Sequence, residues 1–316
     1  MKNFAITGVG GFVAPRHLRA IYDTGNRVVA AVDPNDSVGI LDAFSYDIRF
    51  FREIERFDRH LDKRRREPSA ERVHFVSICS PNYLHDAHAR IALRNDADVI
   101  CEKPLVVNPW NLDALEQMEA ETGRRVFTVL QLRLHPDLVA LRERLQTAVG
   151  VRHTVQLSYV TSRGAWYDAS WKGTEMHSGG VAANVGIHFF DLLIWLFGSV
   201  RDSEVHHRDA RCFSGRLDLE RADVTWFLSV DRHDMPVPAT PGRPATFRSI
   251  TVDGVEVEFS EGFTDLHRRV YEACLQGRGF GIADARPSIE VVHRIRHEAL
   301  TTAGEWHPLL VARRNR

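Results

Sequence analysis

A glycine-rich turn between two apolar runs constrains the fold of this chain most strongly. Residues 4–7 form a short strand pattern that enters the turn at 8–11, and a helical pattern follows from about 15 to 24. A second apolar run, at 28–32, ends at Asp33, about 25 residues after the first glycine. This order is typical of a dinucleotide-binding βαβ unit, in which the glycines admit the pyrophosphate and the acid accepts the ribose hydroxyls.

The glycine positions fit this pattern with one extra residue. Read as G-x-G-x-x-G from Gly8, the sixth position holds Val13, whereas a turn longer by one residue places Gly8, Gly11 and Ala14 at the small positions. Asp33 favours NAD over NADP, because a carboxylate there repels a 2′-phosphate. The alternative for Asp33 is an ordinary polar residue at the end of a strand.

Lys103 follows another apolar run, at 98–101. This run is too short for a buried helix and is typical of a covered strand. Pro104 ends the run, because proline has no N–H to give a sheet. Lys103 should therefore stand at the carboxyl end of a strand, where open α/β sheets bind ligands. The alternative is a solvated lysine at a strand-to-loop corner. The run 75–79 ends similarly, in Ser80-Pro81-Asn82.

Two domains are expected from the change of pattern along the chain. Strands alternate with helices over residues 1–131, which predicts an α/β Rossmann domain with a doubly wound, mostly parallel sheet. Alternating strands, with a hairpin turn at Asp253-Gly254, follow in residues 132–316. These predict an α+β domain with an open, mainly antiparallel sheet, suited to substrate binding and oligomerisation.

Two segments of the second half carry candidate substrate-binding residues. Residues 162–173 combine Arg163 and Lys172 with three aromatic side chains, which suit an anion and the C–H face of a sugar. The alternative is a loop packed on the sheet with its cations in water. Further on, His188 enters an apolar helix, with Asn184 one turn earlier. A lone histidine there is usually a core residue, but the neighbouring amide favours a site.

Charge and cysteine usage exclude several classes of function. With 41 Lys and Arg against 42 Asp and Glu, the net charge of −1 supplies no general attraction to nucleic acid or to a membrane surface. The four cysteines form no C-x-x-C pair, and His85 and His88 lack a third ligand nearby, so we expect no metal site. The amino terminus lacks a signal-peptide pattern, which favours a cytoplasmic protein.

These residues together resemble the Gfo/Idh/MocA oxidoreductase family over essentially the whole chain. The markers are the glycine turn, the segment 80–85, Glu102-Lys103-Pro104 and the run 179–188. The resemblance implies an NAD-dependent enzyme with a small-molecule substrate, which acts as a homo-oligomer, with a tetramer favoured. It also leaves open an NAD-dependent glycosidase, another sugar or polyol dehydrogenase, and a non-catalytic NAD-sensing regulator.

A closer match is to the branch of this family that oxidises UDP-N-acetylglucosaminuronic acid at its 3-hydroxyl, for a diacetamido-uronic acid of lipopolysaccharide. It is carried by the segments 162–167, 170–173, 184–188 and 259–265. Asn184 stands where many family members have Asp, so it can orient the histidine or bind a sugar hydroxyl but cannot relay a proton.

The resemblance also implies roles for single residues. The expected catalytic residues are His188 as general base, Lys103 as hydrogen-bond donor to the reacting oxygen, and Asn184 as orienting residue. The expected cofactor-binding residues are Gly8, Gly10, Gly11, Phe12, Val13, Asp33, Asn35, Ser80, Pro81, Asn82, His85, Glu102, Lys103 and Gln131. The expected substrate-binding residues are Arg133, Ser162, Arg163, Tyr167, Trp171, Lys172, Asn184, His188 and Arg248, the last from a neighbouring subunit.

Overall fold

A computed structural model describes residues 1–148, 150–236, 246–257 and 265–316 of the chain. The chain forms two compact units. The first consists of Met1–Leu134 and Phe263–Arg286, and the second of His135–Gly262 and Pro287–Arg316.

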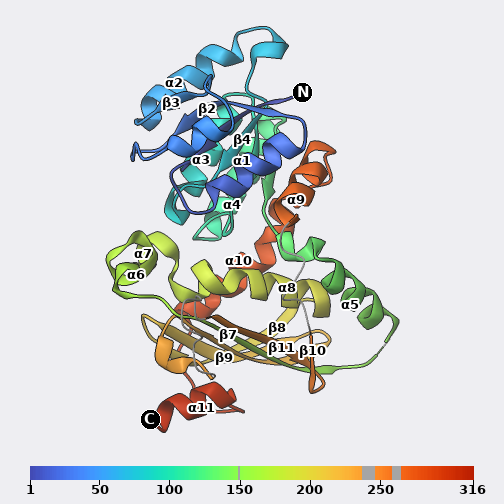
Figure 1. The fold of residues 1–316 in the computed structure, drawn as a ribbon. Coiled ribbons are helices and arrows are strands. Elements are labelled where there is room, and N and C mark those ends of the chain that lie inside the picture. The colour runs from blue at the N-terminus through green and yellow to red at the C-terminus, as the bar shows by residue number, and fades with distance from the viewer. Residues whose placement is uncertain (149, 237–245, 258–264) are drawn as a thin grey trace. The chain divides into compact units, whose positions relative to one another are not determined.

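The first unit is built on a parallel six-stranded sheet with the order β3-β2-β1-β4-β5-β6 (Figure 1). Its strands are β1 (Asn3–Thr7), β2 (Arg27–Val32), β3 (Arg49–Phe51), β4 (Phe75–Ile78), β5 (Asp98–Cys101) and β6 (Val126–Thr128). Every residue of β1 and β4 is buried, because helices cover both faces of the sheet. This burial explains why apolar and polar residues do not alternate regularly along these strands.

The helices of the first unit connect the strands, and α9 joins them from much later in the chain. They are α1 (Ala14–Asp23), α2 (Ile54–Arg65), α3 (His85–Arg94), α4 (Trp110–Thr122) and α9 (Leu266–Leu275). Short 3₁₀ turns lie at Gly39–Ala43, Ser69–Glu71, Asn82–Leu84 and Gln131–Leu134. The strand order reverses between β1 and β4, and ligands of open α/β sheets bind at the carboxyl ends of strands at this position.

The second unit contains a six-stranded sheet with the order β12-β11-β7-β10-β9-β8 (Figure 1). Among the described pairs of neighbouring strands in this sheet, only β7–β10 is parallel. The strands are β7 (His153–Thr161), β8 (Val200–Arg208), β9 (Cys212–Leu219), β10 (Ala222–Ser229), β11 (Thr246–Val252) and β12 (Val255–Glu256). The helices are α5 (Pro136–Thr147), α6 (Ala165–Ala169), α7 (Glu175–Ser178), α8 (Ile187–Phe197), α10 (Ile282–His297), which begins in the first unit, and α11 (Pro308–Arg314).

Neighbouring residues of β10 serve opposite faces of this sheet, as the two-residue period of a strand requires. Trp226 meets Phe190 of α8 edge to face, with ring centroids 5.3 Å apart. Phe227 stacks on His307, the residue before α11, at 5.5 Å. The sheet is therefore covered by α8 on one face and by α11 on the other (Figure 1).

The predicted fold class is confirmed for both halves of the chain. The expected division after residue 131 differs from the structure, in which the first unit runs to Leu134 and also includes Phe263–Arg286, whose helix α9 packs on α1. The hairpin at Asp253-Gly254 is present, with φ of 51° and 79° at the two turn residues.

The helical run Glu175–Phe197 is longer than the apolar segment alone suggests. It is long and apolar enough to cross a membrane by length and composition, but 67% of its apolar window is buried inside the protein. Phe190 of this run, for example, is fully buried. The run therefore has the burial of a core helix.

Candidate functional site

The glycine turn at the end of β1 can only be built with glycine at its first position. Gly8 has φ of +71°, and a Cβ atom there would lie 2.5 Å from the backbone atoms of Cys79 and Ser80. Gly11 donates its N–H to the Gly8 carbonyl at 3.0 Å, which closes the turn just before α1. The turn thus presents bare backbone at the carboxyl edge of the sheet, which is the surface that a pyrophosphate requires.

Asp33 is fixed beside this turn by two backbone donors. Gly10 donates its N–H to Oδ2 at 2.9 Å, and Asn35 donates its N–H to Oδ1, also at 2.9 Å. The carboxylate is mostly buried and carries the negative charge that the 2′-phosphate of NADP would meet. Gly8, Gly10, Gly11, Asp33 and Asn35 are therefore brought together, and they fit NAD.

Other predicted cofactor-binding residues lie around the same edge. Gln131 follows β6 in a 3₁₀ turn, and its side-chain Oε1 is buried without a hydrogen-bond partner among the described residues. An orphaned buried acceptor fits a ligand amide. Phe12, by contrast, is 88% exposed on the turn, under the Arg16 guanidinium. Val13 precedes the first residue of α1 and makes no side-chain cap.

His85 connects the two polar strand ends of the sheet. Its ring nitrogens lie 2.7 Å from the Pro104 carbonyl oxygen and 2.8 Å from the Ser80 carbonyl oxygen. The ring is buried, and this burial lowers its pKa. His85 therefore ties the turn at residues 80–82 to the loop of Lys103, whose peptide bond to Pro104 is cis.

Glu102 directs its carboxylate into a buried cluster. His17 Nε2 of α1 lies 2.9 Å and His267 Nε2 of α9 3.3 Å from the same Glu102 oxygen, and the Lys103 N–H donates to the other oxygen at 3.3 Å. Burial raises the pKa of Glu102, but hydrogen bonds from the two histidines outweigh it and hold that pKa well below its usual range. The cluster thereby anchors the backbone of Lys103.

A second layer of partners completes the Glu102 cluster. The Tyr271 hydroxyl lies 2.8 Å from His17 Nδ1 and 2.6 Å from Ser77 Oγ. Glu102 and the two histidines offer ligand atoms within 4.8 Å of one another, a spacing that a metal could use, but hydrogen bonds already engage these atoms. Sequence reasoning missed His17, His267 and Tyr271, because nothing in their own helices marks them as partners of Glu102.

In the second unit, Asn184 and His188 lie one turn apart, as predicted. Asn184 belongs to a π-helical turn, Ala182–Gly186, and His188 to the first turn of α8. Such turns are frequent at functional sites. The Asn184 amide donates to the Tyr167 hydroxyl at 3.3 Å. Burial raises the pKa of Tyr167, so its hydroxyl remains neutral and able to accept.

The segment with the predicted anion-binding residues folds into two short helical turns. Ser162 and Arg163 follow β7, Tyr167 lies within α6, and Trp171 and Lys172 form a 3₁₀ turn. Tyr167 is 1% exposed and supports Asn184 from below the surface. The Lys172 ammonium lies 4.3 Å from the Trp171 ring centroid. Burial lowers the pKa of Lys172, and the charge of Arg163 lowers it further.

Two other predicted substrate-binding residues have different surroundings. Arg133 is buried, and its guanidinium pairs with the Asp284 carboxylate at 3.2 Å and donates to the Asp284 carbonyl at 3.0 Å. These contacts join η4 (Gln131–Leu134) to α10. Arg248 stands on β11 opposite Tyr159 of β7. Residues 259–264 of the predicted motif lie outside the described residues.

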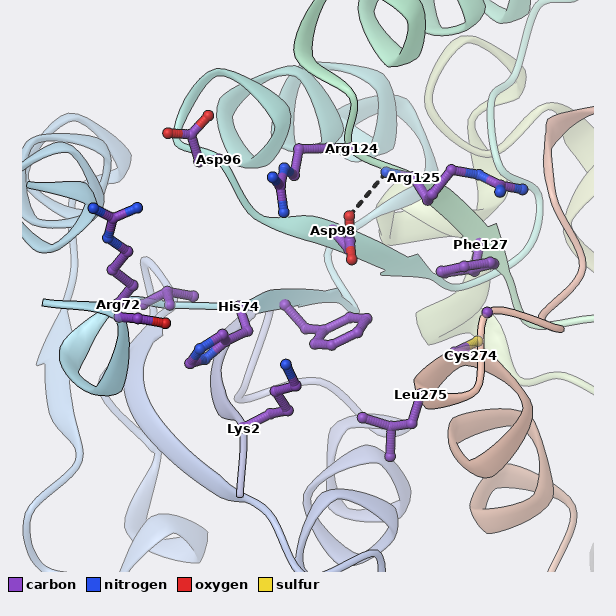
Figure 2. Close-up of a pocket in the computed structure, with 14 residues that line it drawn as sticks. Lys2, Arg72, His74, Asp96, Asp98, Arg124, Arg125, Phe127, Cys274 and Leu275 are labelled. Carbon is purple, nitrogen blue, oxygen red and sulfur yellow. Dashed lines mark hydrogen bonds between the residues drawn. The ribbon is translucent and has the colours of Figure 1, made fainter.

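A cavity of about 550 Å³ lies at the opposite edge of the first sheet (Figure 2). Its lining includes Lys2, His74, Asp98 and Arg125, which lie at the amino ends of β1, β4, β5 and β6. Because Gly8 and Lys103 follow the carboxyl ends of strands, this cavity is separate from the predicted cofactor site.

Two family models match the chain. Residues 2–130 match the NAD-binding Rossmann fold of the GFO_IDH_MocA oxidoreductase family, and residues 150–223 match the α/β C-terminal domain of the same family. The chain belongs to the Gfo/Idh/MocA family. It is therefore an NAD-dependent oxidoreductase by family, which confirms the prediction of enzyme class and cofactor.

Solved structures include highly similar relatives. The WlbA (WbpB) dehydrogenase from Thermus thermophilus, solved with NAD and UDP-GlcNAcA, is 48% identical, with a TM-score of 0.93 over 98% of this chain and 99% of that one. The WlbA dehydrogenase from Bordetella pertussis is 19% identical, with a TM-score of 0.74 over 94% of this chain and 96% of that one, and shows the fold.

A curated relative matches a smaller part of the chain. D-glucoside 3-dehydrogenase from Escherichia coli strain K12 is 32% identical over 133 residues, which are 39% of this chain and 35% of the relative. The match thus spans about a third of that relative's length.

Proposed function

We propose that this protein uses NAD to oxidise the 3-hydroxyl of UDP-N-acetylglucosaminuronic acid to the 3-keto sugar. The observation that carries this proposal is the similarity to the Thermus thermophilus dehydrogenase, which was solved with NAD and UDP-GlcNAcA and matches over nearly the whole of both chains. Lys103, Asn184 and His188 of this chain supply the groups that such an oxidation needs.

The chemistry divides between the cofactor and the protein. Bound NAD supplies an acceptor for the hydrogen and electron pair that leave carbon 3. His188 takes the proton of the 3-hydroxyl as general base. Lys103 donates a hydrogen bond to the same oxygen while it becomes a carbonyl, which stabilises its developing charge. Asn184, held by Tyr167, orients the histidine or the sugar.

Arg163 and Lys172 are proposed to bind the anionic end of the substrate. Both are cationic and partly exposed in the segment before α7. Arginine suits planar pairing with phosphate or carboxylate oxygens, and lysine provides a point charge. The adjoining Trp171 ring offers a flat apolar surface.

The catalytic roles are tested by Lys103→Ala and His188→Ala. Each should lower turnover about 100-fold or more, because each removes a group that acts on the reacting oxygen. NAD binding, measured by fluorescence titration, should persist in both variants. Unchanged turnover in either variant would remove that residue from the mechanism.

The substrate is tested by incubating the protein with UDP-N-acetylglucosaminuronic acid and NAD and following the product by mass spectrometry. A parallel reaction contains alpha-ketoglutarate, because a Thermus thermophilus WlbA structure 49% identical to this chain was solved with NAD and that compound. We expect a 3-keto product, with more turnovers when alpha-ketoglutarate recycles the cofactor. No oxidised sugar in either reaction, or oxidation of a simple D-glucoside instead, contradicts the assignment.

We further propose a cytoplasmic homo-oligomer, with a tetramer favoured, that supplies a precursor of lipopolysaccharide. The four cysteines are buried free thiols, which suits a reducing compartment. Light scattering coupled to size-exclusion chromatography tests the oligomer, and a monomeric mass contradicts it. In an oligomer Arg248 could serve a neighbouring site, so Arg248→Ala should then raise the KM for the UDP-sugar.

A further inference from the structure

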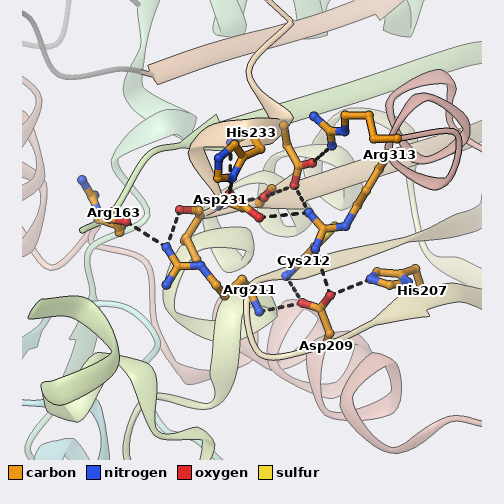
Figure 3. A network of polar contacts seen from close by, with 12 residues as sticks. Arg163, His207, Asp209, Arg211, Cys212, Asp231, His233 and Arg313 are labelled. Atoms are coloured by element: carbon orange, nitrogen blue, oxygen red, sulfur yellow. Dashed lines mark hydrogen bonds and ion pairs between the residues drawn. The ribbon is translucent and has the colours of Figure 1, made fainter. Parts of the chain in front are cut away.

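Arg211 makes an unusual set of contacts with the segment that precedes α7. It directly precedes β9, and its Nη1 donates to both carboxylate oxygens of Asp168, at 2.7 and 2.6 Å. Its Nη2 donates to the carbonyl oxygens of Arg163 at 2.8 Å and Val230 at 3.1 Å (Figure 3). One guanidinium thus holds both the first cation of this segment, through its backbone, and the acid that follows it.

Arg211 is itself held in place by a network around Asp209 (Figure 3). The Arg211 and Cys212 N–H groups each donate to Asp209 Oδ1 at 2.7 Å. Arg313 of α11 donates to the other oxygen at 3.1 Å, and His207 Nε2 lies 2.9 Å from it. Arg211 therefore belongs to a tight turn between β8 and β9. The backbone from which its guanidinium extends is held in place by this turn.

Asp168 is the only acidic residue between residues 162 and 173. Arg163 and Lys172 make no ion pair with an acid within the described parts of the chain, whereas Asp168 pairs with Arg211. Asp168 is near both cations along the folded chain. It follows Arg163 by five residues, and Arg211 contacts both the Arg163 carbonyl and the Asp168 carboxylate. The Asp168 Cα would lie 2.6 Å from a Cβ placed on Gly173, the neighbour of Lys172.

We propose that Arg211 is a positioning residue that holds Asp168 away from Arg163 and Lys172 and so keeps both cations available for the anionic end of the substrate. This inference rests on the proposed function of those two cations. Without Arg211, Asp168 becomes an intramolecular competitor of the substrate, at the high effective concentration that a short connection creates. Arg211 thereby contributes to affinity without contacting the substrate.

The electrostatics of the segment agree with this role. The positive charge of Arg163 contributes to the lowered pKa of Lys172, after burial, so the two cations sense each other. A freed carboxylate between them would relieve that repulsion, and so would a phosphate or carboxylate of the substrate. The two anions compete for the same positive field.

The test compares Arg211→Gln, Asp168→Asn and the double variant Arg211→Gln/Asp168→Asn. Arg211→Gln should raise the KM for UDP-N-acetylglucosaminuronic acid about tenfold, with a smaller change in kcat and none in the KM for NAD. The double variant should recover most of that loss, because the competing carboxylate is gone. Asp168→Asn alone should stay close to the unmodified protein.

Arg216→Gln is the matched control. Arg216 lies on β9, the strand that follows Arg211, and pairs with Asp223 and with Glu204, whose carboxylate oxygen is 3.4 Å away. Its removal costs a similar ion pair away from the substrate segment, so the KM should not change. Arg211→Lys keeps a cation for Asp168 and should also keep the KM low, which separates loss of charge from loss of folding.

Calorimetry on the NAD-saturated protein measures the affinity for UDP. It therefore detects weaker binding of the anionic end of the substrate without requiring turnover. If the protein binds UDP but does not oxidise the sugar, the proposed reaction is wrong. The UDP affinities of the variants, compared with that of the unmodified protein, then still test the role of Arg211. The inference is overturned if Arg211→Gln binds as tightly as the unmodified protein, if the double variant is no better than Arg211→Gln, or if UDP does not bind at all.

Discussion

Gly8 and Gly25 have nearly the same backbone conformation, with φ of +71° and +73°, but different surroundings. A Cβ on Gly8 would meet backbone atoms of Cys79 and Ser80 at 2.5 Å, whereas a Cβ on Gly25 would meet nothing within 4 Å. Gly25→Ala should therefore cost only the strain of the left-handed backbone, about 1–2 kcal/mol of unfolding free energy.

Gly8→Ala should cost more than Gly25→Ala and should also weaken NAD binding at least tenfold, because the turn must move from the place where the pyrophosphate lies. Urea unfolding and NAD titration of both variants measure the two effects. Equal NAD affinity in the two variants would show that close packing at Gly8 does not shape the cofactor site.

At the residue scale, the sequence predicts contacts that local geometry determines. Gly10 and Asp33 lie in one βαβ unit, so the contact between them follows from spacing alone. The partnership of His17 with Glu102 depends on α1 facing the end of β5, and that of His267 on a helix from the far end of the chain. The resemblance predicts Arg133 as a substrate ligand, and its pairing with Asp284 could not be predicted because it depends on the returning segment.

At the element scale, α9 belongs to the first unit although it follows the second along the chain. Tyr271 of α9 is fully buried, and its hydroxyl meets His17 Nδ1 and Ser77 Oγ. Tyr271→Phe keeps the ring but leaves two buried polar atoms with one partner fewer, which should cost about 1–3 kcal/mol. Tyr46→Phe is the control, because Tyr46 is 87% exposed.

Urea unfolding at neutral pH measures both tyrosine variants. A loss for Tyr271→Phe no larger than that for Tyr46→Phe would mean that the hydroxyl does not tie α9 to the sheet. The boundary predicted at residue 131 rests on the periodicity of the sequence. Periodicity cannot show that α9, much later in the chain, packs in the first unit. Amphipathic helices such as α9 carry no signal of which sheet they will cover.

At the scale of the whole molecule, both units contain a buried histidine that resists protonation. Burial lowers the pKa of His88 in the first unit and of His307 in the second, each to about 4. His307 precedes α11, and its Nδ1 accepts the Leu309 N–H at 3.1 Å. His88 Nδ1 lies 2.9 Å from Ser80 Oγ. Protonation of His307 at Nδ1 would remove the acceptor of the Leu309 N–H.

These depressed pKa values make both units less stable in acid. Each histidine binds its proton near pH 6.5 in the unfolded chain but only near pH 4 in the folded protein. Its contribution to the free energy of unfolding is therefore fully present above about pH 6.5 and declines as the pH falls toward 4. At pH 5 the loss relative to pH 7.5 should be on the order of 2 kcal/mol for each histidine. His307→Asn keeps a side chain that can cap α11 and removes the titrating ring.

Unfolding of the unmodified protein, His307→Asn and His88→Gln at pH 7.5 and pH 5 tests this expectation. Each variant should narrow its own stability difference between the two pH values by about 2 kcal/mol, and the comparison at pH 7.5 gives the cost of the substitution itself. Because the two residues lie in different units, the double variant should narrow the difference by the sum. If the pH dependence of stability is undiminished in His307→Asn, then His307, at the amino terminus of α11, is protonated in the folded protein as readily as in the unfolded chain.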